Sequence, residues 1–180
     1  QRVESLCVSN GLTNLMGELY ESVLERPIAA NIRKSLLERY LGMLNGQTDN
    51  QARDTFLRIH AQLFCISPSP YLATLLEKFT AKDESALRTW TGYIEEAMSE
   101  IEDSSTKIKL YATLTHIFLD ILKDDENAAE SAKNILNLDP SSVVAFKTCF
   151  SCNERREDYF ECCELFKSFP IDKFTSEDRK

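Results

Sequence analysis

The sequence has few of the residues that interrupt helices and few that carry chemistry. Its 180 residues include five glycines, five prolines and two histidines. No segment alternates polar and apolar residues over the length of a strand, so a β-sheet is not expected. No glycine-rich phosphate loop, dinucleotide fingerprint or nucleophile elbow is present either. We therefore expect an all-α protein that is not an enzyme and holds no cofactor.

Basic residues and long apolar runs are also scarce. The chain has 21 lysines and arginines against 29 aspartates and glutamates, which gives a formal net charge of −8. A protein that binds nucleic acid through a general basic field needs clustered Lys and Arg, so direct binding to nucleic acid is not expected. No apolar run approaches the roughly 18 residues of a membrane-spanning helix, so no membrane contact is expected.

The six cysteines lie among aliphatic and aromatic neighbours. In a helical, acidic chain this setting favours reduced, buried thiols over a secreted disulfide framework, and it predicts an intracellular protein of the cytoplasm or nucleus. Four thiolates, from Cys149, Cys152, Cys162 and Cys163, would bind zinc if they converged, which leaves a zinc-stabilised helical module as an alternative. Because the second pair is adjacent and suits chelation poorly, we interpret all four as structural thiols and expect no metal.

Apolar residues recur every three to four positions along the chain and predict about nine helices. The first is expected over residues 3–24 and a short fourth helix over 71–79. Pro70 fits the first turn of that fourth helix, and Asp83 fits the N-cap of the next. Gln1 opens directly into a helical pattern and Thr175 or Ser176 resembles a further cap, so we expect the chain to be part of a longer protein.

Residues 109–169 have the spacing of a repeated helix pair. Ala128 is a small residue twelve positions before Pro140, and Cys162 followed by Phe166 repeats a small position and then a large, inward-facing one. Small side chains let paired helices approach closely, and large ones fill the remaining gap. This spacing resembles the tetratricopeptide (TPR) repeat, a 34-residue helix pair, if the turn before Ala128 holds one extra residue. Asn153 departs from the pattern, because it replaces an aromatic residue.

The resemblance implies one all-α domain over residues 1–180, in which antiparallel helix pairs stack as a TPR-like α-solenoid. Irregular pairs are expected over 1–104 and repeats over 105–180. In such arrays the first helices of successive pairs line a groove that holds a partner peptide or helix. The implied function is a protein–protein interaction scaffold in a multisubunit intracellular complex, with self-association possible through an open end of the stack. The partner-binding residues that the register implies are Lys147, Ser151, Glu154 and Arg155.

A second function remains open. Trp90, Tyr93 and Glu96 resemble in part the half-a-TPR motif of RNA-processing factors. In that motif the acidic residue stands seven positions after the tryptophan, where this chain has Ala97. An RNA-associated helical repeat is therefore the alternative to a protein scaffold.

Several aromatic and imidazole side chains lie in helices with apolar neighbours. We expect His60 and His116 to be partly buried and hydrogen-bonded rather than ligands or bases. Tyr20, Tyr40 and Trp90 would be anchors for a partner if they were exposed. Their spacing favours the core instead.

Overall fold

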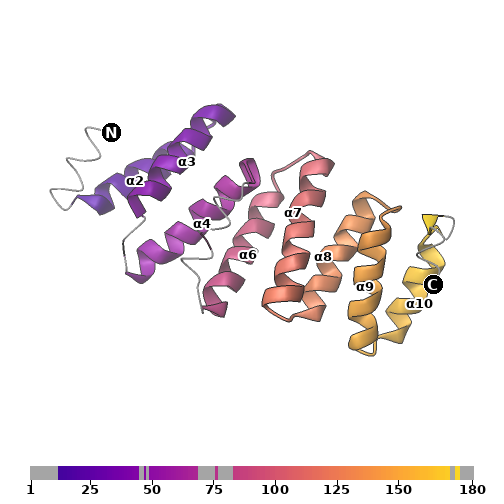
Figure 1. The fold of residues 1–180 in the computed structure, drawn as a ribbon. Coiled ribbons are helices and arrows are strands. Elements are labelled where there is room, and N and C mark those ends of the chain that lie inside the picture. Colours follow the sequence, from indigo (N-terminus) through magenta and orange to yellow (C-terminus); the bar gives the residue numbers. More distant parts are fainter. Residues whose placement is uncertain are drawn as a thin grey trace. The chain divides into compact units, whose positions relative to one another are not determined.

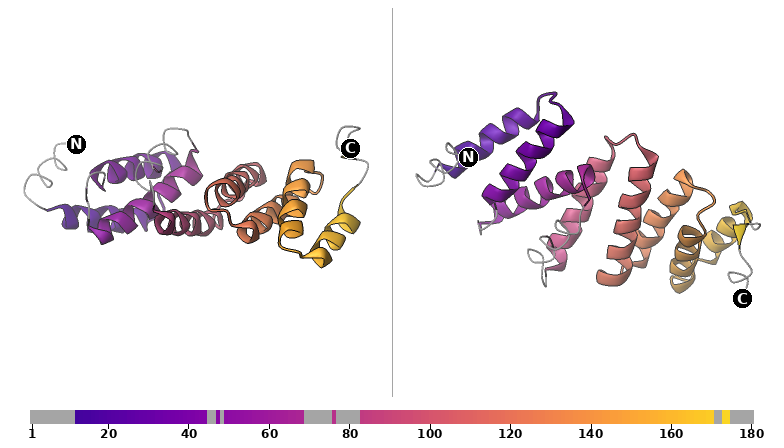
Figure 2. Two further views of the ribbon diagram at one scale, coloured as in Figure 1. Left: turned by 60° about the horizontal axis from the view of Figure 1, so that its bottom comes forward. Right: turned by 45° about the horizontal axis from the view of Figure 1, so that its top comes forward.

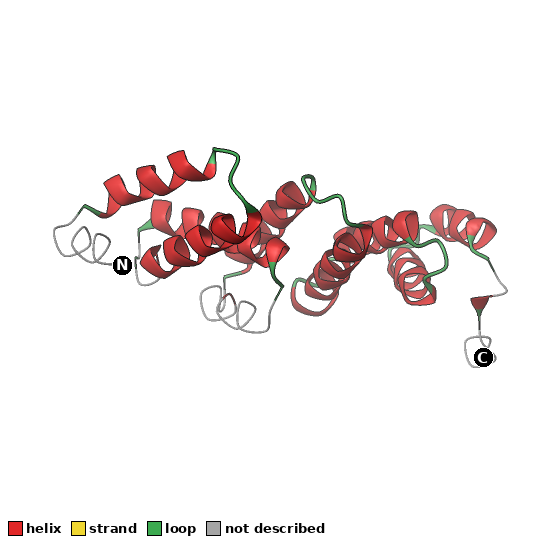
Figure 3. Cartoon of the chain, turned by 90° about the horizontal axis from the view of Figure 1, so that it is seen from above, coloured by secondary structure: helices red, strands yellow, loops and turns green. Residues whose placement is uncertain are grey.

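The computed structural model describes residues 12–44, 47, 49–68, 76, 83–170 and 173–174. These residues contain eight α-helices and one π-helical segment and no strand (Figures 1 and 3), so the expected all-α class is confirmed. The chain divides into two compact units, Gln1–Ser99 and Glu100–Lys180. That they form a single domain stays a prediction. Several expected features lie outside the described residues: the helix start at residue 3, Pro70, the body of the short helix over 71–79 and the cap at Thr175 or Ser176.

The first unit contains four described helices: α2 (Thr13–Leu24), α3 (Ala30–Leu44), α4 (Asn50–Ile66) and α6 (Glu84–Met98). α2 packs on α3, and α3 packs on α4 (Figure 1). Asp49 and Asp83 cap α4 and α6, and each carboxylate accepts the backbone N–H of the alanine three residues on, at 2.8 and 3.0 Å. Capping satisfies a donor that the first turn of a helix leaves unpaired, which is why both helices begin at an aspartate. The predicted cap at Asp83 is confirmed.

α4 and α6 lie side by side and run in the same direction. Arg53 pairs with Asp83 where both helices begin, and near their ends the Cys65 thiol lies 3.9 Å from the carbonyl oxygen of Ile94. The two capping aspartates are 34 positions apart, and buried positions recur at the same interval. The recurring buried pairs are Phe56 and Trp90, His60 and Ile94, and Phe64 and Met98.

His60 is the polar centre of this core. Its side chain is fully buried, and Nδ1 accepts the indole N–H of Trp90 at 3.0 Å, while the rings of Phe56 and Phe64 stack on either side. A buried donor or acceptor without a partner is destabilising, so the two polar ring groups satisfy each other. The expectations of a hydrogen-bonded His60 and of a core position for Trp90 are confirmed.

Tyr20 and Tyr40 are also buried, as expected, and their rings stack at 4.9 Å between α2 and α3. Glu21 accepts hydrogen bonds from the Tyr40 hydroxyl at 3.3 Å and from Arg58 at 2.6 Å, which ties α2 to α3 and α4. Burial, together with the Glu21 carboxylate, raises the pKa of Tyr40 to about 12. A side chain at Gly17 would lie 3.1 Å from the Tyr40 hydroxyl, so glycine permits this close approach.

The second unit contains α7 (Ser104–His116), the π-helical segment η1 (Ile117–Ile121), α8 (Asp125–Leu138), α9 (Val143–Arg155) and α10 (Tyr159–Ser168). α8 packs against both α7 and α9, and α9 packs on α10 (Figure 2). α8 approaches two neighbours closely because its contact faces carry small side chains. The small buried residues of α8 are Ala128, Ala129, Ser131 and Ala132.

Two expectations for this unit are wrong. His116 is exposed and pairs with Asp120 at 2.5 Å, because it lies on the side of its helix opposite the buried residues. Phe166, expected to face inward, is 50% exposed, although its ring still touches Phe146. The residues of α10 that pack inward are Cys162 and Leu165.

The two turns between paired helices in this unit have the same construction. Lys123 and Glu157 have positive φ angles of 53° and 59°, a conformation that residues other than glycine seldom adopt. Each is followed by an aspartate, Asp124 or Asp158, whose carboxylate caps the next helix. Both pairs of equivalent positions are 34 residues apart.

One extra residue distinguishes the first turn from the second. The N–H of Asp124 donates to the carbonyl of Phe118, six positions back, whereas the N–H of Asp158 donates to that of Asn153, five positions back. The extra residue falls within η1, where the N–H of Leu122 bonds to the carbonyl of Ile117, five positions back, as in a π-helix. The expected additional residue is therefore absorbed by the end of the helix rather than by the turn.

We predict that deletion of Asp120 leaves the second unit folded, because it converts the π-helical turn into the spacing found between α9 and α10. The free energy of unfolding should fall by no more than about 1 kcal/mol, the size of a mild surface change. Deletion of Ser151 is the control. It rotates Cys152 and Asn153 out of the core and should cost more than about 3 kcal/mol. Urea unfolding followed by circular dichroism measures both, and equal losses would contradict the assignment of the extra residue to η1.

We predict that Trp90→Phe lowers the free energy of unfolding by roughly 2–4 kcal/mol, because it removes the donor to buried Nδ1 of His60 and leaves a small void. The matched control is Tyr93→Phe on the same helix. That change removes an exposed hydroxyl that donates to Asp54 at 2.9 Å, and it should cost less than about 1 kcal/mol. If thermal and urea unfolding show both variants to be equally stable, the His60–Trp90 bond is not a determinant of this core.

Candidate functional site

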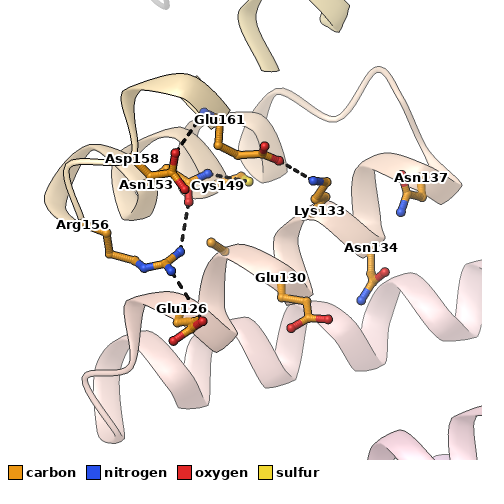
Figure 4. A pocket seen from close by; sticks show the side chains of 11 residues that line it. Glu126, Glu130, Lys133, Asn134, Asn137, Cys149, Asn153, Arg156, Asp158 and Glu161 are labelled. Carbon is orange, nitrogen blue, oxygen red and sulfur yellow. Dashed lines mark hydrogen bonds and ion pairs between the residues drawn. The ribbon is translucent and has the colours of Figure 1, made fainter. Parts of the chain in front are cut away.

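A cavity of about 470 Å³ lies in the second unit among α8, α9 and α10 (Figure 4). A volume of a few hundred Å³ is the size of pockets that hold small ligands or short peptide segments. A cavity of the first unit, beside Tyr40, is smaller at about 170 Å³. The residues that line the larger one, called the α8–α10 cavity below, are Glu126, Ala129, Glu130, Lys133, Asn134, Asn137, Cys149, Asn153, Arg156, Asp158 and Glu161.

α8 provides one wall of the cavity through a polar stripe. Its lining residues are spaced three and four positions apart, which places them on one face of a helix. Ala129 is the small member of this face and leaves space beside α9. The polar members are Glu126, Glu130, Lys133, Asn134 and Asn137.

Two ion pairs join the walls of the cavity. Lys133 on α8 pairs with Glu161 on α10, and that hydrogen bond raises the pKa of the lysine. Arg156, in the turn after α9, lies 3.5 Å from Glu126 on α8 and donates to the side-chain oxygen of Asn153 at 3.3 Å. Both cations of the cavity are therefore already neutralised by carboxylates.

The floor of the cavity is neutral. Asn153 is 2% exposed, and its amide nitrogen donates to the sulfur of Cys149 at 3.6 Å. Burial raises the pKa of the Cys149 thiol to about 11, so the thiol is protonated at neutral pH. The replacement of an aromatic residue by Asn153 is the signal in the sequence that points to this floor.

Asn134 and Asn137 remain available for a ligand. Within the described part of the chain neither side-chain amide forms a hydrogen bond, and the two lie one turn apart on the rim formed by α8 (Figure 4). An amide offers both a donor and an acceptor, which matches the two polar groups of a peptide bond. Glu130 also forms no ion pair with another described residue. The free polar groups of the cavity are thus two amides and one carboxylate.

The partner-binding residues implied by the sequence lie elsewhere on α9. Lys147, Ser151, Glu154 and Arg155 do not line the cavity, because they lie on the opposite side of α9 from Cys149 and the rest of the floor. Ser151 is half-buried and the other three are exposed. Their role in binding a partner stays a prediction.

Arg155 also has a structural partner. Its guanidinium donates to both carboxylate oxygens of Asp125, at 2.9 and 2.5 Å, and joins the end of α9 to the start of α8. This contact shows that the two helices are antiparallel. The hydrogen bonds from Arg155 lower the pKa of Asp125, so the pair is charged at neutral pH. Arg155 therefore has a structural role, because it holds α9 against α8.

The four cysteines of the zinc alternative do not converge on one point. Cys149, Cys152 and Cys162 are buried, whereas Cys163 is exposed. Burial raises the pKa of all three buried thiols, which favours the protonated form over a metal-binding thiolate. In the described ranges, no group of three or more His, Cys, Asp or Glu side chains is placed to hold a metal ion.

None of the helices seen in the described part of the chain combines the length and the apolar character that crossing a bilayer requires. No protein-family model, no curated protein and no solved structure matches the chain. The function proposed below is therefore inferred from the cavity and the helices around it.

Proposed function

We propose that the chain is a protein-interaction module built of TPR-like helix pairs, which acts as a scaffold in an intracellular complex. The observation that carries this proposal is the α8–α10 cavity, whose rim presents the unbonded amides of Asn134 and Asn137. The ligand that fits is a short extended segment of a partner protein. The side-chain amides of Asn134 and Asn137 are suited to binding such a segment rather than to catalysing a reaction.

The regular spacing of the fold supports the helix-pair interpretation. The caps at Asp49 and Asp83 are 34 residues apart, and so are the turns that end at Asp124 and Asp158. An interval of 34 residues is the length of one TPR unit. Stacking of such pairs into a solenoid would give a rigid curved surface along which a partner can lie.

The chemistry of the cavity supports a peptide ligand. An extended segment exposes backbone N–H and C=O groups, and Asn134 and Asn137 can pair with both kinds. Glu130 supplies a negative charge that no ion pair with a described residue neutralises, so the segment should carry a lysine or arginine near that position. Because Lys133 and Arg156 are already paired with carboxylates, an acidic segment would have to displace an existing ion pair.

The RNA-associated alternative has less support. The cavity contains four carboxylates and two cations, an excess of negative charge that repels phosphates. Trp90, the residue that suggested this alternative, is buried and does not offer its ring to a base. RNA binding is therefore kept only as a possible result of the affinity capture described next.

We predict that the double variant Asn134→Ala/Asn137→Ala recovers about tenfold less partner than the unchanged chain in affinity capture from a cell lysate. The loss of two or three hydrogen bonds of about 0.5–1.5 kcal/mol each accounts for this factor. The matched control is Lys147→Ala/Glu154→Ala on the opposite side of α9, and each capture is done with and without nuclease. Bound proteins are quantified by mass spectrometry.

Partner loss in the α9 control alone would place binding on the face that the sequence implied, and not in the cavity. Partners that disappear with nuclease would overturn the protein-scaffold proposal in favour of the RNA alternative. A folded state equal to that of the unchanged chain, checked by circular dichroism, is required of both variants.

A further inference from the structure

α10 carries a second apolar stripe that its own unit leaves exposed. Cys162 and Leu165 pack inward against α9. Tyr159 is 62% exposed and Phe160 is 75% exposed, and both begin the helix. With the exposed thiol of Cys163 and with Phe166, they form a contiguous arc of about 120° on the helix, since successive residues are about 100° apart. We call these four residues the α10 face.

The size of this face is that of the largest apolar patch on a typical monomer, which is often functional. An aromatic side chain has roughly 150–250 Å² of surface, so the three exposed rings present on the order of 400 Å². Isolated exposed apolar side chains are common, but a contiguous patch of a few hundred Å² is typical of an interaction site. We therefore expect another protein surface to bind the α10 face.

Exposed residues of α10 are evenly spaced on either side of Cys163. Phe160 and Phe166 are each three positions from Cys163, and Tyr159 and Lys167 are each four positions from it. Two antiparallel copies of the helix that cross at Cys163 would place Phe160 of one copy against Phe166 of the other. Tyr159 would then lie opposite Lys167, whose ammonium group can bind the face of the ring. The small side chain at the centre permits close approach, and the flanking rings fill the space on either side.

We propose that α10 is a self-association surface, through which two copies of the chain pair antiparallel about a twofold axis at Cys163. A surface that is complementary to itself is what a twofold interface requires, because each residue meets its counterpart from the other copy. Lys167 is held on this surface by Glu164 at 2.6 Å, so its charge is balanced within each copy and does not oppose the contact.

The area of the α10 face sets the strength of the contact. It is about half of the roughly 800 Å² per partner that a stable interface buries, so the dimer should be weak and concentration-dependent. We expect a dissociation constant of the dimer on the order of 100 µM. This interaction is separate from binding in the α8–α10 cavity, and either can fail without the other.

Sedimentation velocity of the whole chain over a range around 100 µM tests the proposal. The unchanged chain should shift from monomer to dimer, and Phe160→Glu should remain a monomer at every concentration. The matched control is Val144→Glu, which changes another exposed apolar residue of the same unit (77% exposed) and should dimerise like the unchanged chain. A monomer at all concentrations, or equal effects of the two variants, would overturn the proposal and leave the face to a helix of another protein.

A short bismaleimide cross-linker gives an independent measurement. Two copies that cross at Cys163 bring their exposed thiols together, so a covalent dimer should form and should be lost in Cys163→Ser. Cross-linking that persists in Cys163→Ser would place other cysteines at the contact and would overturn the antiparallel arrangement.

Discussion

The second unit depends on how its paired helices are joined. A residue with positive φ reverses the chain, and the aspartate that follows caps the next helix. Because a helix end leaves its first N–H groups unpaired, this arrangement lets a new helix start directly after the reversal without a long loop. The turn formed by Glu157 and Asp158 also supplies part of the cavity, since Arg156 and Asp158 line it. The residues that determine the connection thus also position the site.

α8 both packs against its two neighbouring helices and forms one wall of the cavity. Its small buried side chains let α7 and α9 pack on two of its faces, and the remaining face carries the polar stripe that borders the cavity. A helix with large residues at those buried positions would hold α9 further away and would change the volume beside it. Packing against two neighbours also restrains the backbone of α8, so the positions of Asn134 and Asn137 on the rim are set by the fold.

Much of the fold follows from local patterns in the sequence. The three-to-four spacing of apolar residues predicts the helices. Asp83 marks the start of α6 as its N-cap, and the small residue Ala128 predicts a close helix pair. The two wrong predictions have different physical causes. The apolar sequence neighbours of His116 lie around the helix rather than beside it, so they do not bury its side chain. Phe166 lies beside the buried stripe of α10 that Cys162 and Leu165 form, so half of its side chain stays exposed.

The cavity could not be predicted from the sequence alone. Its α8 wall has the composition of an ordinary solvated helix face, and only the placement of α9 and α10 turns that face into a pocket. Ion pairs such as Lys133 with Glu161 join residues far apart in the chain, and no local pattern indicates them. Asn153 departs from the expected repeat pattern in the sequence, but only the structure shows that it is buried at the floor of the cavity.

Site-specific photo-cross-linking tests directly whether a partner protein binds in the α8–α10 cavity. A photoreactive benzoylphenylalanine is placed at Asn137, on the rim of the cavity, and in a parallel sample at Ser151, on the other side of α9. If a partner segment binds in the cavity, irradiation in lysate should give a covalent adduct with one partner protein from position 137 and not from position 151, and nuclease should not remove it. An adduct from position 151 alone, or an adduct with RNA, would show that the cavity is not the binding site for a partner protein.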